Sequence, residues 1–145
     1  MQGQKSDSLV SASAEDYLEA IFRITTNRRV ARSKEIAEAM GVTKSSVTTA
    51  LKQLSASGLV NYDPYSYVTL TKAGEDIGRS VEERHQFLAG FLEKVLGVDA
   101  QRADQNACRL EHVLDKEVYE RLTAFACFLE AQGITSETWQ EGQSE

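Results

Sequence analysis

Three residues with metal-ligating side chains stand close together late in the sequence: Cys108, Glu111 and His112. On a helix, residues three and four positions apart share one face, with Cβ atoms about 5–6 Å apart. Apolar residues, among them Leu110 and Val113, flank them, so this face is predicted to be partly buried. A buried carboxylate or thiolate is costly unless it is paired or coordinates a metal. The spacing therefore predicts a site for a divalent transition-metal ion.

Further candidate ligands lie elsewhere in the chain. Asp16 and Glu19 are three residues apart on the first predicted helix, and His85 lies on a long helix later in the sequence. Each has a simpler explanation, because the helix dipole favours acidic residues in a first turn and most histidines are not ligands. Cys108 could equally be a small buried hydrophobe. The complete predicted ligand set is Asp16, Glu19, His85, Cys108, Glu111 and His112.

The donor types in this set narrow the choice of metal. Carboxylates and imidazoles suit Mn²⁺ and Fe²⁺, whereas a thiolate moves the preference towards Fe²⁺, Co²⁺, Ni²⁺ or Zn²⁺. The donor types alone therefore leave Fe²⁺, Mn²⁺, Co²⁺, Ni²⁺ and Zn²⁺ open as the bound ion.

Hydrophobic periodicity and capping residues predict the elements that must position these side chains. A first helix is predicted to begin with Ser13 as its cap, and further helices are predicted over residues 33–40, 43–56, 71–96, 100–115 and 116–131. Strands are predicted over 59–62 and 67–70, with a short strand at 28–31. Residues 1–10 and 133–145 are predicted to lie outside regular elements.

A helix, a turn at Gly41, a second helix and a hairpin follow one another in the order of a winged helix-turn-helix. The second of these helices carries small hydroxyls and lysines away from its apolar stripe, which suits a helix in a DNA major groove. Such a face can also be merely solvated, in a winged helix used for protein contacts. The predicted DNA-binding residues are Arg32, Thr43, Lys44, Ser45, Ser46, Thr48, Thr49, Lys52, Tyr65 and Ser66.

Charge is distributed unevenly along a chain with a net charge of −6. Basic residues gather between Arg28 and Lys52, whereas acidic residues dominate from Glu75 onward, which suggests two separate tasks. The predicted fold is mainly α, with an N-terminal winged helix-turn-helix in residues 1–74. An all-helical dimerisation and metal-binding domain is predicted in residues 75–145. No apolar run is long enough for a membrane span and no signal peptide is recognisable, so we expect a cytoplasmic protein.

Two apolar stripes in the C-terminal half predict a homodimer. One contains Val81, Leu88, Phe91, Leu92 and Val95, and the other contains Val118, Leu122, Phe125 and Leu129. They could instead only close the core of the monomer. Three apolar helices beyond a winged helix favour a two-fold interface.

Several segments together resemble the diphtheria-toxin-repressor family, in that family's order and over about residues 12–130. They are Glu15–Phe22, Glu35–Met40, Ser45–Thr48, Leu70–Gly74, Arg84-His85 and Cys108–His112. The resemblance implies a homodimeric repressor that binds double-stranded operator DNA when loaded with Fe²⁺ or Mn²⁺, and that controls metal-uptake genes.

Within that family the chain resembles the short, manganese-regulator-like branch, which lacks a third, SH3-like domain. Asp16 and Glu19 match the N-terminal ligands of that branch. Cys108 instead matches the Cys-x-x-Glu-His pattern of the iron branch. The ancillary site of the iron branch is matched only by His85, because Ala89 and Asp104 replace its Glu and His.

Three other functions compete with this interpretation. A metalloenzyme would use Glu111 as a base and would need a substrate pocket. No further motif in the sequence indicates such a pocket. A thiol-redox regulator would act through oxidation of Cys108. A metal-independent winged-helix module would bind its partner without an ion. Affinity for duplex DNA that depends on metal distinguishes all three from a metal-dependent repressor that is not an enzyme.

Overall fold

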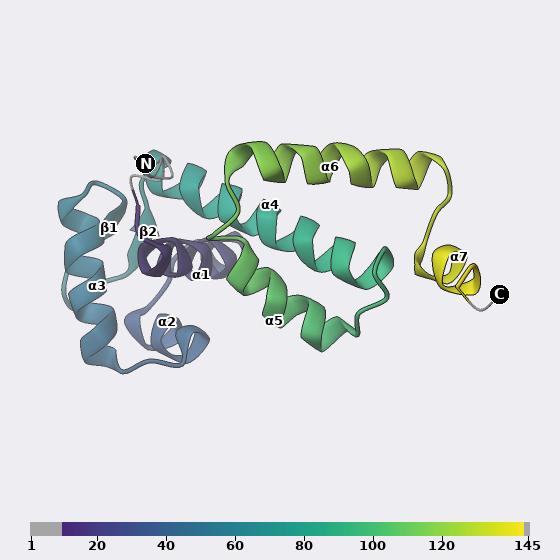
Figure 1. Cartoon of the computed structure of the whole chain (residues 1–145). Coiled ribbons are helices and arrows are strands. Elements are labelled where there is room, and N and C mark those ends of the chain that lie inside the picture. The colour runs from purple at the N-terminus through teal and green to yellow at the C-terminus, as the bar shows by residue number, and fades with distance from the viewer. Residues whose placement is uncertain (1–9, 144–145) are drawn as a thin grey trace, which may run out of the picture. The chain divides into compact units, whose positions relative to one another are not determined.

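The structure is a computed structural model of the chain and describes residues 10–143, which are mainly helical (Figure 1). The described residues divide into two compact units, one reaching Glu82 and the other beginning at Glu83. The boundary falls within the longest helix, α4. The elements are α1 (Ala12–Arg28), α2 (Ser33–Met40), α3 (Lys44–Ala56), β1 (Val60–Tyr62), β2 (Val68–Leu70), α4 (Lys72–Lys94), α5 (Ala100–Leu110), α6 (Lys116–Ala131) and α7 (Ser136–Glu141).

The first unit is a winged helix-turn-helix with one hydrophobic core. Gly41 has a φ of 66° and ends α2, which is the left-handed geometry that glycine adopts without strain. Thr43 then caps α3 by accepting a hydrogen bond from the backbone N–H of Ser46 at 3.2 Å. Helices α1, α2 and α3 share this core with the hairpin, and its buried side chains include Leu18, Ile21, Ile36, Val47, Leu51 and, from β2, Val68.

The hairpin is a two-stranded antiparallel sheet in which Val60 pairs with Leu70 and Tyr62 with Val68. The predicted short strand at residues 28–31 is wrong for most of its length, because α1 continues to Arg28. Only Ala31 joins the hairpin, as an isolated bridge whose N–H donates to the Val68 carbonyl at 2.9 Å. The first helix also begins earlier than predicted, because its cap is Ser11.

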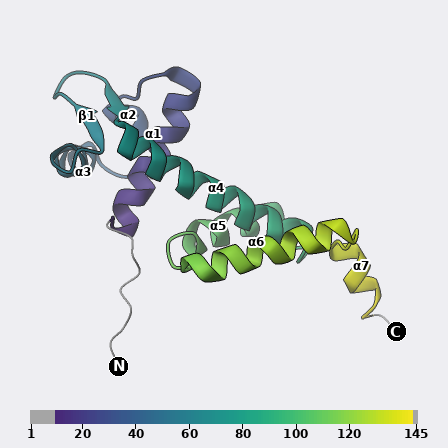
Figure 2. The ribbon, with the colours of Figure 1, turned by 90° about the horizontal axis from the view of Figure 1, so that it is seen from above.

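The second unit contains the end of α4 together with α5, α6 and α7, and Figure 2 shows α5 and α6 beside that part of α4. Phe87 of α4 meets Tyr119 of α6 edge to face, with ring centroids 5.5 Å apart. The expectation of no regular element after residue 132 is wrong, because α7 forms there. Its Trp139 indole N–H donates to the Val95 carbonyl, which ties α7 to the end of α4.

The two apolar stripes serve the monomer core only in part. Leu88 and Leu129 are buried, which agrees with the alternative that the stripes close the core of the monomer. Other apolar side chains of α6 remain accessible, with Phe125 exposed by 52% and Phe128 by 56%. The unit thus has an exposed aromatic surface on α6. Among residues 10–143, no helix combines the length and the apolar character that crossing a bilayer requires.

Substitution of Gly74 tests how closely α4 approaches the hairpin. A Cβ atom added at Gly74 would lie 1.9 Å from the carbonyl oxygen of Leu59, which is backbone and cannot turn aside. Gly74→Ala should therefore lower the free energy of unfolding by about 1–3 kcal/mol or more. Gly90→Ala is the control, because no atom of residues 10–143 outside its own helix lies within 4 Å of the added Cβ.

The control should leave stability unchanged or raise it by up to about 1 kcal/mol through helix propensity. Urea denaturation at one fixed protein concentration measures both variants. Equal stability of Gly74→Ala and the parent would contradict the close approach.

Candidate metal centre and nucleic-acid interface

Glu111 stands at the point where α5 ends. The helix closes at Leu110, and Glu111 is its C-cap, with φ −58° and ψ −25°. Its N–H still donates to the Ala107 carbonyl at 2.9 Å. His112 lies in the turn that follows. The prediction that Cys108, Glu111 and His112 share one face of a continuous helix is therefore corrected: they belong to a helix end and its turn.

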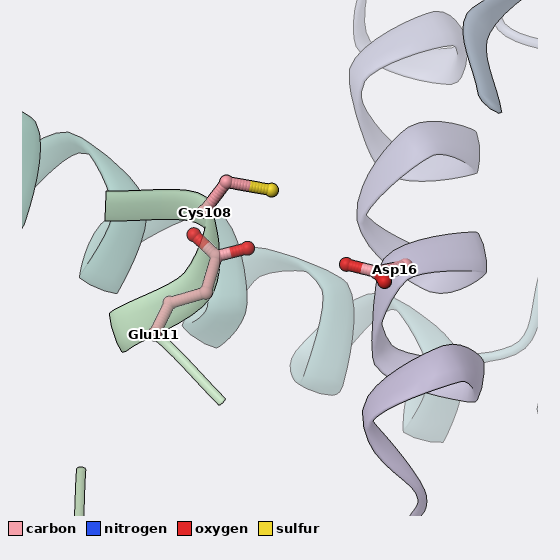
Figure 3. Close-up of side chains that lie close together, drawn as sticks. All are labelled: Asp16, Cys108 and Glu111. Atoms are coloured by element: carbon pink, nitrogen blue, oxygen red, sulfur yellow. The ribbon is translucent and has the colours of Figure 1, made fainter. Parts of the chain in front are cut away.

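Burial divides these side chains. Glu111 is completely buried, whereas Cys108 is exposed, so the predicted partial burial holds for the carboxylate and is wrong for the thiol. Cys108 lies one turn before the helix end, and a ligand atom of each residue lies within 4.8 Å of the other. Figure 3 shows both side chains at the end of α5, and that of Asp16 on α1.

Two imidazole rings approach the Glu111 carboxylate. His85 Nδ1 lies 2.7 Å from Oε2, and His112 Nε2 lies 3.3 Å from Oε1. A carboxylate without solvent contact is strongly destabilised unless cationic or hydrogen-bonding groups surround it. Oxygen and imidazole nitrogen donors are the types that bind Mn²⁺ and Fe²⁺, and the nearby thiol adds a softer donor. The residues of the second unit therefore fit a divalent transition-metal ion.

Arg84 holds the turn that carries Glu111 and His112. Its guanidinium donates to the Glu111 carbonyl at 3.1 Å and to the Leu114 carbonyl at 3.2 Å. It also lies 5.1 Å from the centre of the Tyr119 ring, in a cation–π contact. The first bond satisfies a carbonyl that the end of α5 leaves without a helical partner, and the second satisfies a carbonyl in the segment before α6. Nothing in the sequence spacing predicts this role.

In the first unit, α1 carries the two other predicted carboxylate ligands, one helical turn apart. Glu19 is buried, with 4% of its surface exposed, and Asp16 is half-buried. Arg23 Nη2 lies 2.7 Å from Glu19 Oε1, and the same guanidinium forms an ion pair with Glu82. The negative charge of Glu19 thus has a neighbouring cation within its own unit.

The polar face of α3 contains the predicted DNA-contacting residues. Thr43, Lys44, Ser45, Ser46, Thr49 and Lys52 are exposed, and Thr48 is half-buried. The Thr48 hydroxyl donates to the Lys44 carbonyl at 3.0 Å, and the Thr49 hydroxyl donates to the Ser45 carbonyl at 3.1 Å. Because their protons are engaged, these hydroxyls present acceptor lone pairs and methyl groups to the surroundings. Such groups match an amino group or a thymine methyl in a major groove.

The hairpin tip adds aromatic and cationic groups. Tyr65 has a φ of 76° and is fully exposed, and Ser66 beside it donates its N–H to the Asp63 carbonyl at 2.9 Å. Arg32, at the start of α2, lies 5.2 Å from the centre of the Tyr67 ring, and its Nη2 donates to the Tyr67 hydroxyl at 3.3 Å. The predicted contact residues on α2, α3 and the hairpin are thus all solvent-accessible to some degree.

Comparison with known families matches nearly the whole described chain. Residues 9–68 match the family described as iron dependent repressor, N-terminal DNA binding domain. Residues 71–139 match the family described as iron dependent repressor, metal binding and dimerisation domain. The two matches agree with the winged helix in the first unit and the helical second unit.

Individual proteins similar to this chain are also transcriptional regulators. An HTH-type transcriptional regulator of Methanocaldococcus jannaschii is 39% identical over 117 residues, covering 80% of this chain and 94% of that protein. The HTH-type transcriptional regulator MntR of Lysinibacillus sphaericus is 36% identical over 110 residues, covering 76% of this chain and 78% of that protein.

Among solved structures, a manganese-dependent transcriptional repressor in complex with manganese superposes with a TM-score of 0.73 at 29% identity. The match covers 79% of this chain and 53% of the other, so the chain spans about half the length of that solved relative.

Proposed function

Because the chain belongs to the iron-dependent repressor family of metal-dependent transcriptional regulators, we propose that it is a homodimeric repressor of metal-uptake genes, activated by Fe²⁺ or Mn²⁺. The observation that carries this proposal is the completely buried Glu111 carboxylate, which two imidazoles approach at 2.7 and 3.3 Å. The two transcriptional regulators described above support a role in transcription, and we propose no catalytic step.

We propose that the metal-sensing site consists of Cys108, Glu111, His112 and His85, with Asp16 and Glu19 as further ligands from α1. A bound divalent cation would supply the positive charge that offsets these acidic donors. Asp16 and Glu19 would then tie α1 to the ligands of the second unit, which restrains the DNA-binding domain in one position. A ligand acts in this way when its affinity is higher for the DNA-competent state than for the other states.

The choice between iron and manganese depends on Cys108 in this proposal. A thiolate is a softer donor than a carboxylate and favours Fe²⁺ over Mn²⁺. One solved relative binds manganese, so both ions remain candidates for the physiological cofactor. Co²⁺, Ni²⁺ and Zn²⁺, which bind nitrogen and sulfur donors well, are expected to occupy the site in vitro.

For DNA recognition we propose that α3 enters the major groove and that the hairpin tip lies along the phosphate backbone. Ser46 and Thr48 are proposed to read base edges, and Lys44 and Lys52 to neutralise phosphates. In this proposal residues 1–74 bind the operator in the cytoplasm, and residues 75–145 form the dimer and supply the metal ligands other than Asp16 and Glu19. The exposed Phe125 and Phe128 on α6 support a dimer interface there, because exposed aromatic surface marks association sites.

Changes at the buried ligands test the metal site. Glu111→Gln keeps the size of the side chain but removes its charge, and His112→Ala removes an imidazole. Both should weaken metal-induced DNA binding by about 10-fold or more, because the first removes the negative charge that attracts the cation and the second removes a ligand. The control is Glu117→Gln, since Glu117 is 73% exposed and pairs with Arg121 on its own helix.

Binding is measured by fluorescence anisotropy of a labelled promoter fragment with and without Fe²⁺ or Mn²⁺, and circular dichroism checks the fold. If both ligand variants respond to metal like the control, the ligand assignment is wrong.

Replacement of the thiol tests metal selectivity. Cys108→Glu replaces a soft donor with a hard one, so it should move activation from Fe²⁺ towards Mn²⁺. Cys127→Ser, at the other exposed cysteine, controls for general effects of thiol loss and should retain the preference of the parent. Anaerobic titrations with each ion give the ratio of half-activating concentrations. An identical ratio in Cys108→Glu and the parent would refute a selective role for the thiol.

Lysine substitutions on α3 test how the DNA is held. Lys44→Ala or Lys52→Ala should weaken binding to all sequences and make the slope of log K against log salt less negative by about 0.9 per lost contact. Lys116→Ala, with a side chain 88% exposed on α6, is the control and should leave the slope unchanged. Footprinting should show two protected half-sites related by two-fold symmetry. Protection of a single asymmetric site would argue against DNA binding by a two-fold symmetric dimer.

A further inference from the structure

His85 is fixed through both of its ring nitrogens. Nδ1 lies 2.7 Å from Glu111 Oε2, and Nε2 lies 2.7 Å from Oδ1 of Asp104. The imidazole itself is buried, with 5% of the residue exposed. The Asp104 side chain is 69% exposed and reaches the ring from α5. The ring therefore lies between a buried carboxylate and a solvent-facing one.

We propose that Asp104 is a positioning residue for the metal site, which holds His85 so that Nδ1 is presented to the ion. This inference rests on the proposed function, in which His85 and Glu111 are ligands. The ligand carboxylate of Glu111 lies on the Nδ1 side, so the metal is expected on that side. Nε2 then carries the ring proton and donates it to Asp104.

A carboxylate in this position does two things for a histidine ligand. It fixes the tautomer and the ring orientation, and it makes the coordinating nitrogen a stronger donor. Without Asp104, a water molecule could accept the same proton, but water carries no charge and does not hold the ring in one orientation. Loss of such partners typically weakens metal binding by about 10–100-fold.

The architecture around the pair supports a fixed geometry. Asp104 lies on α5 one turn before Cys108, so the helix that carries a proposed ligand also carries the support for another. Its neighbours Ala103 and Ala107 are almost completely buried and have the smallest side chains available to a packed helix face. Arg84, which precedes His85 on α4, is bonded to the turn after α5. The ring and its carboxylate partner are thus held by the same two elements.

Two other roles for Asp104 make different predictions. As a metal ligand in its own right, it would bind an additional ion with His85 Nε2, and its loss would lower the number of ions bound. As a simple surface ion pair it would contribute little, since exposed pairs contribute about 0–1 kcal/mol to stability, and metal affinity would not change.

The test compares Asp104→Ala and Asp104→Asn with the parent chain. Co²⁺ titrations followed by visible absorption and Mn²⁺ titrations followed by electron paramagnetic resonance give affinity and stoichiometry without DNA. Asp104→Ala should bind about 10–100-fold more weakly with an unchanged number of ions per subunit. Asp104→Asn should retain most of the affinity, because its amide oxygen can still accept the Nε2 proton.

Asp76→Ala is the matched control, because Asp76 is an exposed, ion-paired aspartate on a helix, 54% exposed beside Lys72. Parent-like affinity in Asp104→Ala would overturn the inference, as would a lower ion count in both Asp104 variants. If Asp104→Ala fails to fold, a loss in Asp104→Asn as large as complete removal of a ligand would also overturn it. A parent chain that binds no metal would instead refute the proposed function itself.

Discussion

The buried carboxylate of Glu111 is the constraint on which the metal-sensing half of the molecule depends. Leaving a charged group without solvent or partners costs several kcal/mol, so its surroundings must compensate. His85 and His112 approach its two oxygens, and Arg84 bonds to its backbone carbonyl. The side chain and the main chain of one residue are therefore both held by neighbouring residues of the same unit. Such preorganisation lowers the cost of assembling a coordination site.

The DNA-binding half depends on interactions between residues that are close in sequence. A glycine with positive φ and a threonine cap set the turn between α2 and α3, and the core beneath them is apolar. Hydroxyls on α3 that bond back to the helix leave acceptors and methyl groups outward. The contacts that shape this recognition surface therefore lie within the first unit. In our proposal, metal then controls the position of this surface and leaves its shape unchanged.

The sequence predicted the elements whose limits are set by neighbouring residues. The end of α2 and the cap of α3 were correct because glycine and threonine act locally, whereas α2 begins one residue earlier than predicted, because its cap is Arg32 and not Ser33. The end of α5 was not predictable, because no glycine or proline follows Leu110. The carbonyls of the turn are instead bonded by Arg84, which is far away in sequence. Helix α7 was missed for a similar reason, because Trp139 bonds to α4. From the sequence, Asp104 is recognisable only as a replacement for a histidine of the iron branch's ancillary site. Its position four residues before Cys108, on the same helix face, could have indicated a role beside the metal ligands.

The most direct test is a DNA-binding titration of the unmodified chain under anaerobic, reducing conditions. Promoter fragments, including that of the chain's own gene, are titrated with protein in the presence of Fe²⁺, Mn²⁺, Co²⁺ or Zn²⁺, and in the presence of a chelator. We expect specific binding with Fe²⁺ or Mn²⁺ at physiological salt, and affinity with chelator that falls to the level of non-specific DNA. Equal, sequence-specific affinity with metal and with chelator would contradict a metal-dependent repressor.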